Sequence, residues 1–506
     1  MRGTGNRREF FALAAGGAAV ALIGRSLPGS GTVTHRELPA TTGAVVVGGV
    51  QRFRSRPDLL APDVVIDQPP AARPAGVVVT ESHAGPPQSG PLIVEPTGRI
   101  IWFNPLAPDP ASPLRAFNVS VQTFQGTPVL CWFQGVVAGA HGVGYGQGHY
   151  EIVDANYARI ARVTAHGGYQ GDLHEFFLTP RGTAIFSCYG RAEGQIRIGG
   201  RLRSVPYLYG VIQEVDVTTG RLVWQWRSDR HIALSESYAR PVLRPGWIWD
   251  YMHLNSIAID PSDGNLLVSG RNTSTCYKIN RRTGRVIWRL GGRRSDFHHA
   301  PGTRFNYQHD ARLHAGGVMT VFDNEGGPPR YARQSRALVL SLDERRMRVK
   351  LAHEFRHDPP VYSDALGSVQ SLGRGEWFVG WGRSTNFTLY DRIGNVLLDG
   401  HLSAGSSSYR AFLQPWTGRP LRPPDISVSR SGGGATVYAS WNGATDLAQW
   451  VVLAGSSPSE LTPIGAAPVA GFETAISIAS APAHIAVAAH DAGGRLLATS
   501  ATVTTG

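Results

Sequence analysis

The chain has 506 residues, of which 42% are hydrophobic and 17% are charged, and this globular composition suits more than one buried core. Its 61 glycines and 34 prolines favour many short strands and turns over long helices. The net charge of +12 is carried by scattered arginines without a nucleic-acid-binding motif, so we expect no nucleic-acid partner; anionic small substrates are the functional alternative.

The N-terminal segment, residues 1–30, has the pattern of an export signal. Arg7-Arg8 precede an apolar run that ends at Gly24, which is typical of the twin-arginine route. The run of about 15 residues is short for a membrane span of ~20. An uncleaved N-terminal anchor is the alternative, because no clean Ala-x-Ala site follows. We therefore expect an extracellular or cell-envelope protein that folds before export.

A repeat of turn-then-strand segments follows. The turns begin at intervals of 58, 62, 64, 63 and 48 residues, at Pro96, Asp154, Asp216, Asn280, Asp343 and Asp391. Each unit is too short for a domain and too rich in strand-forming residues for a helical solenoid. Radial stacking of four-stranded sheets satisfies both limits. The pattern therefore predicts an all-β fold with a six-bladed β-propeller over residues 45–420.

The composition changes after the proline-rich segment Trp416–Asp425. Residues 426–506 are poor in charge and rich in Ala, Ser, Thr and Val, with several short strand-like runs. Their number and length predict a small C-terminal β-sandwich of the immunoglobulin or fibronectin type over residues 424–506. Such modules usually serve as spacers or packing platforms.

Four segments contain charged or strongly hydrogen-bonding side chains within sequence that is typical of β-strands. They contain His174 (GDLHEFFL), His253 and Asn255 (DYMHLNSIAI), Arg271 (SGRNTST) and His309 (YQHDARL). Each histidine introduces the apparent innermost strand of its unit, and in a propeller such strand starts converge around one mouth. Arg271 ends the strand that returns by a hairpin from the His253 strand, so we expect it at the same mouth.

Three imidazoles beside a guanidinium leave several kinds of chemistry open. They could bind zinc or copper, but a fixed cation opposes a metal, so we predict no metal and no cofactor. Arg271 favours an oxyanion, because a guanidinium donates directed hydrogen bonds to sulfate or phosphate oxygens. Its charge also keeps a neighbouring imidazole neutral and nucleophilic, which suits covalent transfer of a sulfuryl or phosphoryl group. Asp310 should point to the opposite strand face from His309. The alternative is that a repeated sequence repeats structural histidines.

The segments DYMHLNSI, VSGRNTS, VIWRLGG and NYQHDARL, together with the twin-arginine leader, resemble the bacterial aryl sulfotransferase family. RFRSRPDLLAP and SYRAFLQPW are similar to its actinobacterial branch, and the resemblance covers roughly residues 53–415. The family transfers sulfate between phenols without a nucleotide sulfate donor, on a six-bladed propeller. The resemblance implies a small-molecule aryl sulfate and a phenol as partners. The C-terminal sandwich departs from the best-known enzymes, which carry a sandwich at the N-terminus.

By resemblance, His309 is the histidine that becomes transiently sulfated. His253, Asn255 and Arg271 resemble the group that holds the sulfuryl oxygens, and His174 resembles a further pocket histidine. The neutral ring of His309 would attack the sulfur, while His253 or His174 protonates the leaving oxygen and later deprotonates the acceptor. Two rivals stay open: a sulfatase-like hydrolase that uses the same pocket, and a non-catalytic extracellular propeller that binds ligands. A quinone-dependent dehydrogenase is a third.

Overall fold

The computed structural model describes residues 35–83, 85, 88–107, 113–139, 144–332, 334–403 and 405–505. Strands dominate it, and no α-helix occurs among these residues. The helical turns are four short 3₁₀ segments, η1 (Ser228–Arg230), η2 (Leu234–Glu236), η3 (Arg271–Thr273) and η4 (Gly382–Ser384). The predicted all-β class is therefore confirmed. The export signal lies outside the described residues. None of the helical segments within the described ranges has the length and apolar character needed to cross a membrane.

Six groups of antiparallel strands make up most of the structure, and the first three come from the N-terminal half. The first group contains β33 (Phe412–Gln414), β6 (Val77–Ser82), β7 (Gly90–Val94) and β8 (Ile100–Phe103). The second contains β9 (Arg115–Phe124), β10 (Thr127–Ala138), β11 (Tyr145–Val153) and β12 (Arg159–Val163). The third contains β13 (Gly171–Leu178), β14 (Thr183–Ile198), β15 (Arg201–Asp216) and β16 (Leu222–Arg227), with the short β17 (Trp249–Asp250) parallel to β15. One residue pair between β11 and β13, Gly148 with Gly171, joins the second and third groups into a single nine-stranded sheet.

The remaining three groups follow in chain order. The fourth contains β18 (Leu254–Ile259), β19 (Leu266–Gly270), β20 (Thr275–Ile279) and β21 (Val286–Gly291). The fifth contains β23 (His309–His314), β24 (Val318–Asp323), β27 (Arg336–Asp343), β28 (Arg348–Phe355) and β22 (His298–His299). The sixth contains β29 (Ser368–Ser371), β30 (Trp377–Gly380), β31 (Asn386–Tyr390), β32 (Val396–Leu402) and β5 (Val64–Gln68). A small hairpin of β25 (Gly326–Gly327) and β26 (Arg330–Tyr331) stands beside the fifth group in the chain.

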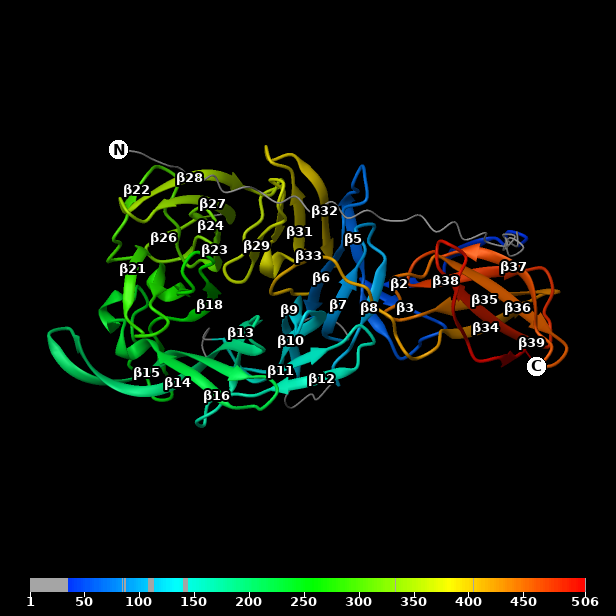
Figure 1. Ribbon diagram of the computed structural model, residues 1–506, viewed down its shortest axis with the longest axis horizontal. Coiled ribbons are helices and arrows are strands. Elements are labelled where there is room, and N and C mark those ends of the chain that lie inside the picture. Colours follow the sequence, from blue (N-terminus) through cyan, green and yellow to red (C-terminus); the bar gives the residue numbers. More distant parts are fainter. Residues whose placement is uncertain are drawn as a thin grey trace, which may run out of the picture.

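One strand from each group faces the centre of this assembly, and we call these six the inner strands: β9, β13, β18, β23, β29 and β33. Each inner strand contacts the next in this order, and β33 contacts β9, so the contacts close a cycle. Figure 1 shows the six groups standing around a common centre. Because β33 comes late in the chain but pairs with β6, the cycle is closed by strands from its two chain ends.

Side chains bridge all six junctions between inner strands. In each case a polar side chain accepts a hydrogen bond from a backbone N–H of the neighbouring inner strand. The six pairs are Gln122 with Leu178, Glu175 with Ile257, Ser256 with Ala311, Asp310 with Val369, Gln370 with Leu413, and Gln414 with Val121. These bonds satisfy backbone groups that a sheet ending at its inner strand would otherwise leave unpaired.

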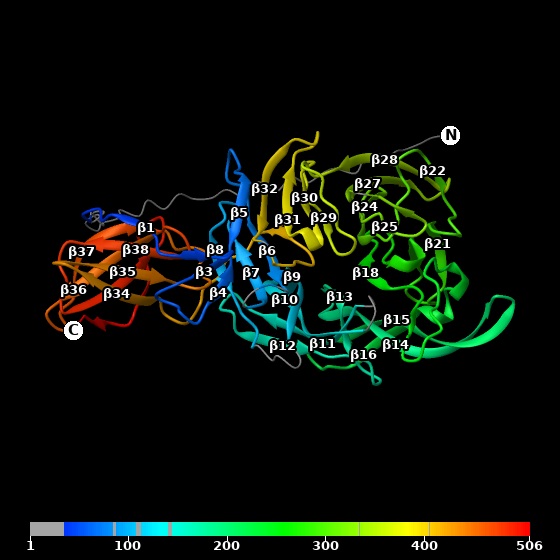
Figure 2. The ribbon, with the colours of Figure 1, turned by 180° about the vertical axis from the view of Figure 1, so that it is seen from behind.

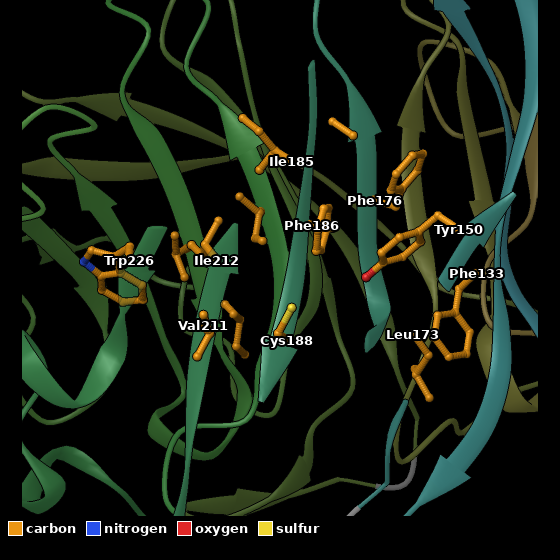
Figure 3. Close-up of a cluster of buried hydrophobic side chains, with 14 of the residues drawn as sticks. Phe133, Tyr150, Leu173, Phe176, Ile185, Phe186, Cys188, Val211, Ile212 and Trp226 are labelled. Carbon is orange, nitrogen blue, oxygen red and sulfur yellow. The ribbon is translucent and has the colours of Figure 1, made fainter. Parts of the chain in front are cut away.

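The cores lie between neighbouring groups, and β10 shows how the sequence builds them. All of residues 129–133 (VLCWF) are buried, because both faces of this sheet are covered. Alternation sends Cys131 and Phe133 to the core shared with the third group, while Leu130 and Trp132 face the first group. Figure 3 shows part of the larger core, where Phe133 packs near Tyr150.

A separate set of strands follows the sixth group. One sheet has β34 (Asp425–Ser431), β35 (Gly434–Ser440), β38 (Glu473–Ile478) and β1 (Ala40–Thr42), and the other has β36 (Gln449–Gly455), β37 (Thr462–Pro468), β39 (His484–His490), β40 (Leu496–Thr499) and β41 (Val503–Thr504). A core that includes Trp450 and Val487 joins them. Figure 2 shows this unit at one side of the six groups.

The N-terminal strands tie this unit to the rest of the chain. β1 pairs with β38, so the predicted range of 424–506 leaves out a strand of the unit. A three-stranded sheet of β2 (Val45–Val47), β3 (Val50–Arg52) and β4 (Leu60–Pro62) follows, and it pairs with none of the six groups. Phe53 packs on Phe472 with ring centroids 4.4 Å apart, and the Ser55 backbone N–H donates to the Glu473 carboxylate.

Candidate functional site

The three histidines singled out in the sequence lie at the starts of three successive inner strands. His174 is in β13, His253 immediately precedes β18, and His309 begins β23. Their exposed fractions are 2%, 2% and 1%. Because these strands are neighbours and run in the same sense around the centre, the histidines meet at one end of the cycle. The structure therefore brings together the residues that the repeat predicted to converge, and their roles stay predictions.

All three inner strands depart from regular pairing where these polar residues occur. The register shifts between Gly171 and Phe176 in β13, between Leu254 and Ser256 in β18, and between His309 and Arg312 in β23. Bulges of this kind re-aim side chains and are common beside active sites.

The backbone of His253 is itself unusual. His253 has a φ of 55°, in the left-handed region that costs a non-glycine residue about 1–3 kcal/mol. Two hydrogen bonds hold this conformation: the Arg271 N–H donates to the His253 carbonyl at 3.0 Å, and the His253 N–H donates to Asp250 Oδ1 at 2.9 Å. The return of the β18–β19 hairpin thus places Arg271 beside His253, as predicted.

His174 and His253 contact each other and are each oriented by an aspartate. Their ring centroids are 4.8 Å apart, with the planes nearly perpendicular. Nδ1 of His174 donates to Asp172 Oδ2 at 2.7 Å, and Nδ1 of His253 bonds Asp250 Oδ2. Since a carboxylate only accepts, a neutral ring at either position carries its proton on Nδ1 and leaves Nε2 with a lone pair.

The tautomer of His309 follows from its partner, Asn324. The Asn324 Nδ2 donates to the carbonyls of Ser363 and Leu366, at 2.9 Å each, which fixes the orientation of this amide. Its Oδ1 therefore faces Nδ1 of His309 at 2.7 Å, so Nδ1 carries the proton. Nε2 of His309 keeps its lone pair and has no hydrogen-bond partner among the described residues.

The surroundings keep the rings of His253 and His309 neutral. Burial, followed by the charge of Arg271, lowers the pKa of His309 well below its usual range, and His174 and His253 add to the effect. Burial and Arg271 likewise lower the pKa of His253. Burial raises the pKa of Asp250 to about 6, against the opposing charge of Arg271. His309 is therefore an uncharged base with a free electron pair at neutral pH.

Arg271 is partly free to bind an anion. Its Nε donates to Asn272 Oδ1 at 3.1 Å, and its guanidinium lies 5.1 Å from the ring centroid of Tyr307. Among the described residues, no carboxylate is within ion-pair distance of Arg271. Its remaining N–H groups are thus available for oxygens of a bound ligand.

Asn255 is buried and lies next to the His309 segment. Its Nδ2 donates to the Gln308 carbonyl at 2.7 Å, which uses one of its two N–H groups. Its Oδ1 has no partner among the described residues. Part of the expected donor capacity of Asn255 is therefore spent on positioning the backbone beside His309.

Asp310 does not join the histidines. It accepts from Arg312 at 2.8 Å and from the Val369 N–H at 2.9 Å, and it lies 3.5 Å from Arg410. Glu175 neutralises the same two arginines. This buried ion network lies along the axis behind the histidines, in agreement with the expectation that Asp310 faces away from His309.

Sequence reasoning missed five residues that shape the site: Asp172, Asp250, Asn324, Tyr189 and Tyr409. The two aspartates stand two and three residues before their histidines, a spacing that was readable. Tyr189 has its ring centroid 6.1 Å from that of His253, and its hydroxyl donates to the Leu254 carbonyl at 2.8 Å. The Tyr409 hydroxyl donates to the carbonyls of His174 and Asn255.

A cavity of about 640 Å³ lies at the other ends of the inner strands, and its lining includes Gln122, Glu175, Arg410 and Gln414. It does not reach the histidines. No group of three or more His, Cys, Asp or Glu side chains within the described ranges is placed to hold a metal ion. The absence of a metal and of a cofactor stays a prediction.

Comparison with known proteins identifies one family. The sequence profile of the arylsulfotransferase (ASST) family matches residues 120–402, which contain His174, His253, Asn255, Arg271 and His309. No curated protein matches the chain.

The similar solved structures have low TM-scores. A protein of unknown function from Bacteroides caccae is 10% identical, with a TM-score of 0.39 over 67% of this chain and 98% of that one. A periplasmic gluconolactonase from Pseudomonas aeruginosa is 11% identical, with a TM-score of 0.35 over 86% and 97%. Virginiamycin B lyase from Staphylococcus aureus is 8% identical, with a TM-score of 0.31 over 79% and 91%. At TM-scores this low, these similarities support no conclusion about the fold or the function of this chain.

Proposed function

We propose, from the premise that this chain belongs to the arylsulfotransferase family, that it moves a sulfuryl group from a phenolic sulfate ester to a phenol through a covalent intermediate on His309. One observation carries the proposal. Nε2 of His309 has a lone pair and no hydrogen-bond partner in the described part of the chain, and burial together with the neighbouring charge of Arg271 keeps the ring neutral.

We further propose that the six strand groups are the blades of a propeller and that the C-terminal unit is a fibronectin- or immunoglobulin-like sandwich. The closed cycle of inner strands, with a late strand pairing with an early one, supports the first proposal. The two antiparallel sheets over one core support the second. In this arrangement the histidines stand at one mouth of the propeller.

In the first half-reaction, Nε2 of His309 attacks the sulfur of the aryl sulfate. The N–S bond forms as the bond from sulfur to the phenolic oxygen breaks, and the electron pair leaves with that oxygen. Arg271 and the second N–H of Asn255 hold the sulfuryl oxygens, where fixed donors stabilise charge in the transition state. The negative charge of the bound sulfate ester also offsets the positive charge of Arg271. His253 can then take up a proton and donate a hydrogen bond to the same sulfuryl oxygens.

We assign proton transfer to His174 rather than to His253. Burial alone would raise the pKa of Asp172, but His174 and the Gly146 N–H outweigh it and the pKa is lowered. An ionised Asp172 stabilises a protonated ring on His174. Asp250, the partner of His253, has a raised pKa beside Arg271 and gives weaker support to a charged ring.

In the second half-reaction, Nε2 of His174 takes the proton of the accepting phenol. The phenolic oxygen attacks sulfur, the N–S bond breaks, and its electron pair returns to Nε2 of His309. Positioned acid–base catalysis of this kind contributes about 10²–10⁴ in rate. His174 gives its Nε2 proton to the leaving oxygen in the first half-reaction and takes one back from the acceptor in the second, so each complete turnover ends in the starting protonation state.

The test is release of nitrophenolate from 4-nitrophenyl sulfate with and without added phenol. We expect release that depends on phenol in the parent protein and is lost in His309→Ala, together with sulfation of His309 detected by mass spectrometry when phenol is omitted. His314→Ala is the matched control, because His314 ends the same strand and bonds Thr320 instead of the site.

The other outcomes separate the rivals. Formation of the intermediate releases one nitrophenolate per enzyme molecule even without phenol, so continued release beyond that amount without phenol would indicate a hydrolase that passes the group to water. Absence of release across several aryl sulfates from the folded parent would reject sulfuryl transfer and favour a binding propeller.

We also propose export by the twin-arginine route, supported by Arg7-Arg8 and the apolar run behind them. Arg7-Arg8→Lys-Lys should retain the protein inside the cells that make it. Unchanged appearance of this variant outside the cytoplasm would refute the proposal.

A further inference from the structure

A second cavity, of about 390 Å³, is separated from His174 and His253 by the ring of Tyr189. It is formed by the loop that leads into β13, the start of β11 and the middle of β14 and β15. Tyr189 lines this cavity, and its ring centroid is also 6.2 Å from His174 and 6.1 Å from His253. The cavity and the site therefore share a wall. Its volume is within the range of about 300–1,000 Å³ that small-molecule sites occupy.

Four tyrosines are among the residues that line this cavity, together with polar side chains and backbone. Tyr145, Tyr169, Tyr189 and Tyr209 all line it. The Tyr145 and Tyr189 centroids are 5.5 Å apart at a tilted angle, and the Tyr169 and Tyr209 hydroxyls are 3.1 Å apart. Offset and tilted ring faces pack favourably against another aromatic ring. The lining therefore suits a planar aryl group.

Glycines let these rings approach the backbone closely. A Cβ at Gly190 would lie 2.3 Å from the Tyr209 ring, and one at Gly146 would lie 2.4 Å from the Leu173 nitrogen. Any larger residue at either position would displace a wall of the cavity. The ring of Tyr209 can therefore occupy its position only because the neighbouring residue is a glycine.

Arg191 adds a positive charge at the edge of the cavity. Its Nη2 donates to the Tyr145 hydroxyl at 2.8 Å, and its side chain is exposed. Among the described residues, no carboxylate forms an ion pair with Arg191. The remaining guanidinium N–H groups can therefore bind an anionic substituent, for which planar bidentate contact is favourable.

One carboxylate connects the cavity to the site. Asp172 Oδ1 accepts from the Gly146 N–H at 2.6 Å, and Asp172 Oδ2 accepts from Nδ1 of His174 at 2.7 Å. The cavity wall and the ring of His174 are therefore held by the same buried group.

We infer that this cavity is the aryl subsite of the transfer reaction, and that it selects phenols carrying a carboxylate or another anionic group. The inference rests on the proposed function. The ring lies against Tyr145 and Tyr189, and the anionic group lies on Arg191. In-line displacement puts both the leaving and the entering oxygen opposite Nε2 of His309, so one cavity serves donor and acceptor in turn.

The experiment compares two acceptors that differ in one charge, 4-hydroxybenzoate and its methyl ester, with 4-nitrophenyl sulfate as donor. The parent should prefer the acid by about 10- to 100-fold in kcat/KM, the size of one charge-assisted hydrogen bond. Arg191→Gln should bring this ratio close to one. Arg197→Gln is the control, since Arg197 is exposed on the same hairpin and bonds Gly200 at its tip.

A second variant tests the aromatic wall. Tyr145→Leu should raise the KM of both acceptors, while Tyr145→Phe should mainly reduce the preference for the acid, because it removes the hydroxyl that orients Arg191. A parent without preference for the acid, or an Arg191→Gln ratio equal to that of the parent, would overturn the inference.

A binding measurement separates this inference from the proposed function. 4-Methoxybenzoate has the same ring and charge but cannot accept a sulfuryl group, and its binding is measured by calorimetry. Binding that weakens in Arg191→Gln supports the subsite even if no transfer is detected. Absence of binding to the parent would refute the subsite, whereas a loss of phenol-dependent release with intact binding would refute only the proposed function.

Discussion

At the scale of single residues, the chemistry depends on which nitrogen of each histidine carries a proton. Asn324, Asp172 and Asp250 each bond an Nδ1, and this leaves three electron pairs on Nε2 atoms at one mouth. The neutral amide of Asn324 bonds His309, whereas the carboxylates of Asp172 and Asp250 bond His174 and His253. A nucleophile needs an uncharged ring, and a proton carrier needs an anion beside it, so the partners differ as the proposed roles require.

Asn324 is therefore predicted to position the nucleophile. Asn324→Ala frees Nδ1 and allows the other tautomer, so kcat/KM should fall at least about tenfold. Asn324→Asp should act differently: the added negative charge raises the pKa of His309, so more of the ring is protonated at neutral pH and activity is regained as the pH rises.

The measurement is kcat/KM against pH for the parent and both variants, with thermal melting to confirm folding. A profile for Asn324→Asp that has the same shape as that of the parent would contradict a positioning role, because a purely structural role lowers activity at every pH alike.

Most of the candidate site could be predicted from the sequence. The histidines stand at equivalent places in three units, and hairpin geometry returned Arg271 to His253. The hairpin at Gly316-Gly317 likewise returns the chain to His309: Phe322 pairs with His309, and Asn324 follows two residues later. Tyr409 gave no signal, because it reaches the site only through the pairing of β33 with β6, which connects chain ends.

At the scale of elements, His357 links the end of β28 to β32. Its Nδ1 bonds the Pro359 carbonyl at 2.7 Å and its Nε2 bonds Asp399 Oδ1 at 3.2 Å. Burial opposes the charged ring, but Asp399 and the carbonyl outweigh it and raise the pKa of His357. Both ring nitrogens donate, so the protonated ring is the form that ties the fifth group to the sixth.

The stabilisation by His357 should therefore depend on pH. A raised folded-state pKa means that the contribution is fully present below the unfolded pKa of about 6.5 and is lost as the pH rises through the folded value. His357→Gln should lower the melting temperature more at about pH 5.5 than at about pH 9. His353→Gln, an exposed histidine of β28, is the control. An equal loss at both pH values would refute the charged pair.

At the scale of the whole molecule, the prediction concerns the ends of the chain. β33 supplies the inner strand of the first group, and it follows the buried residues Tyr409 and Arg410. A chain that ends at residue 411 should be insoluble, because the cycle is then open and β6 has a bare edge. A chain that ends at 424 keeps the cycle, so it should retain activity.

The longer truncation should still melt at a lower temperature than the full chain, because β1, Phe53 and Ser55 lose their partners in the C-terminal unit. Solubility, nitrophenolate release and thermal melting are measured for both chains. A soluble, active chain ending at 411 would show that β33 is dispensable. These N-terminal partners were outside the sequence prediction because they depend on contacts across more than 400 residues, such as the bond of Ser55 to Glu473, 418 residues apart.

The side chains that bridge the inner strands hold the six strand groups together at the centre of the molecule. A glutamine amide carries the same donor and acceptor as a peptide group, and Gln370 and Gln414 use both on one backbone residue of the neighbouring strand. Side-chain hydrogen bonds therefore connect every inner strand to the next around the centre. The covalent chain does not make these connections, because it runs out to the outer strands between one inner strand and the next. Insertions in the outer strands can therefore change the outline of the protein while the spacing of the three imidazoles stays fixed.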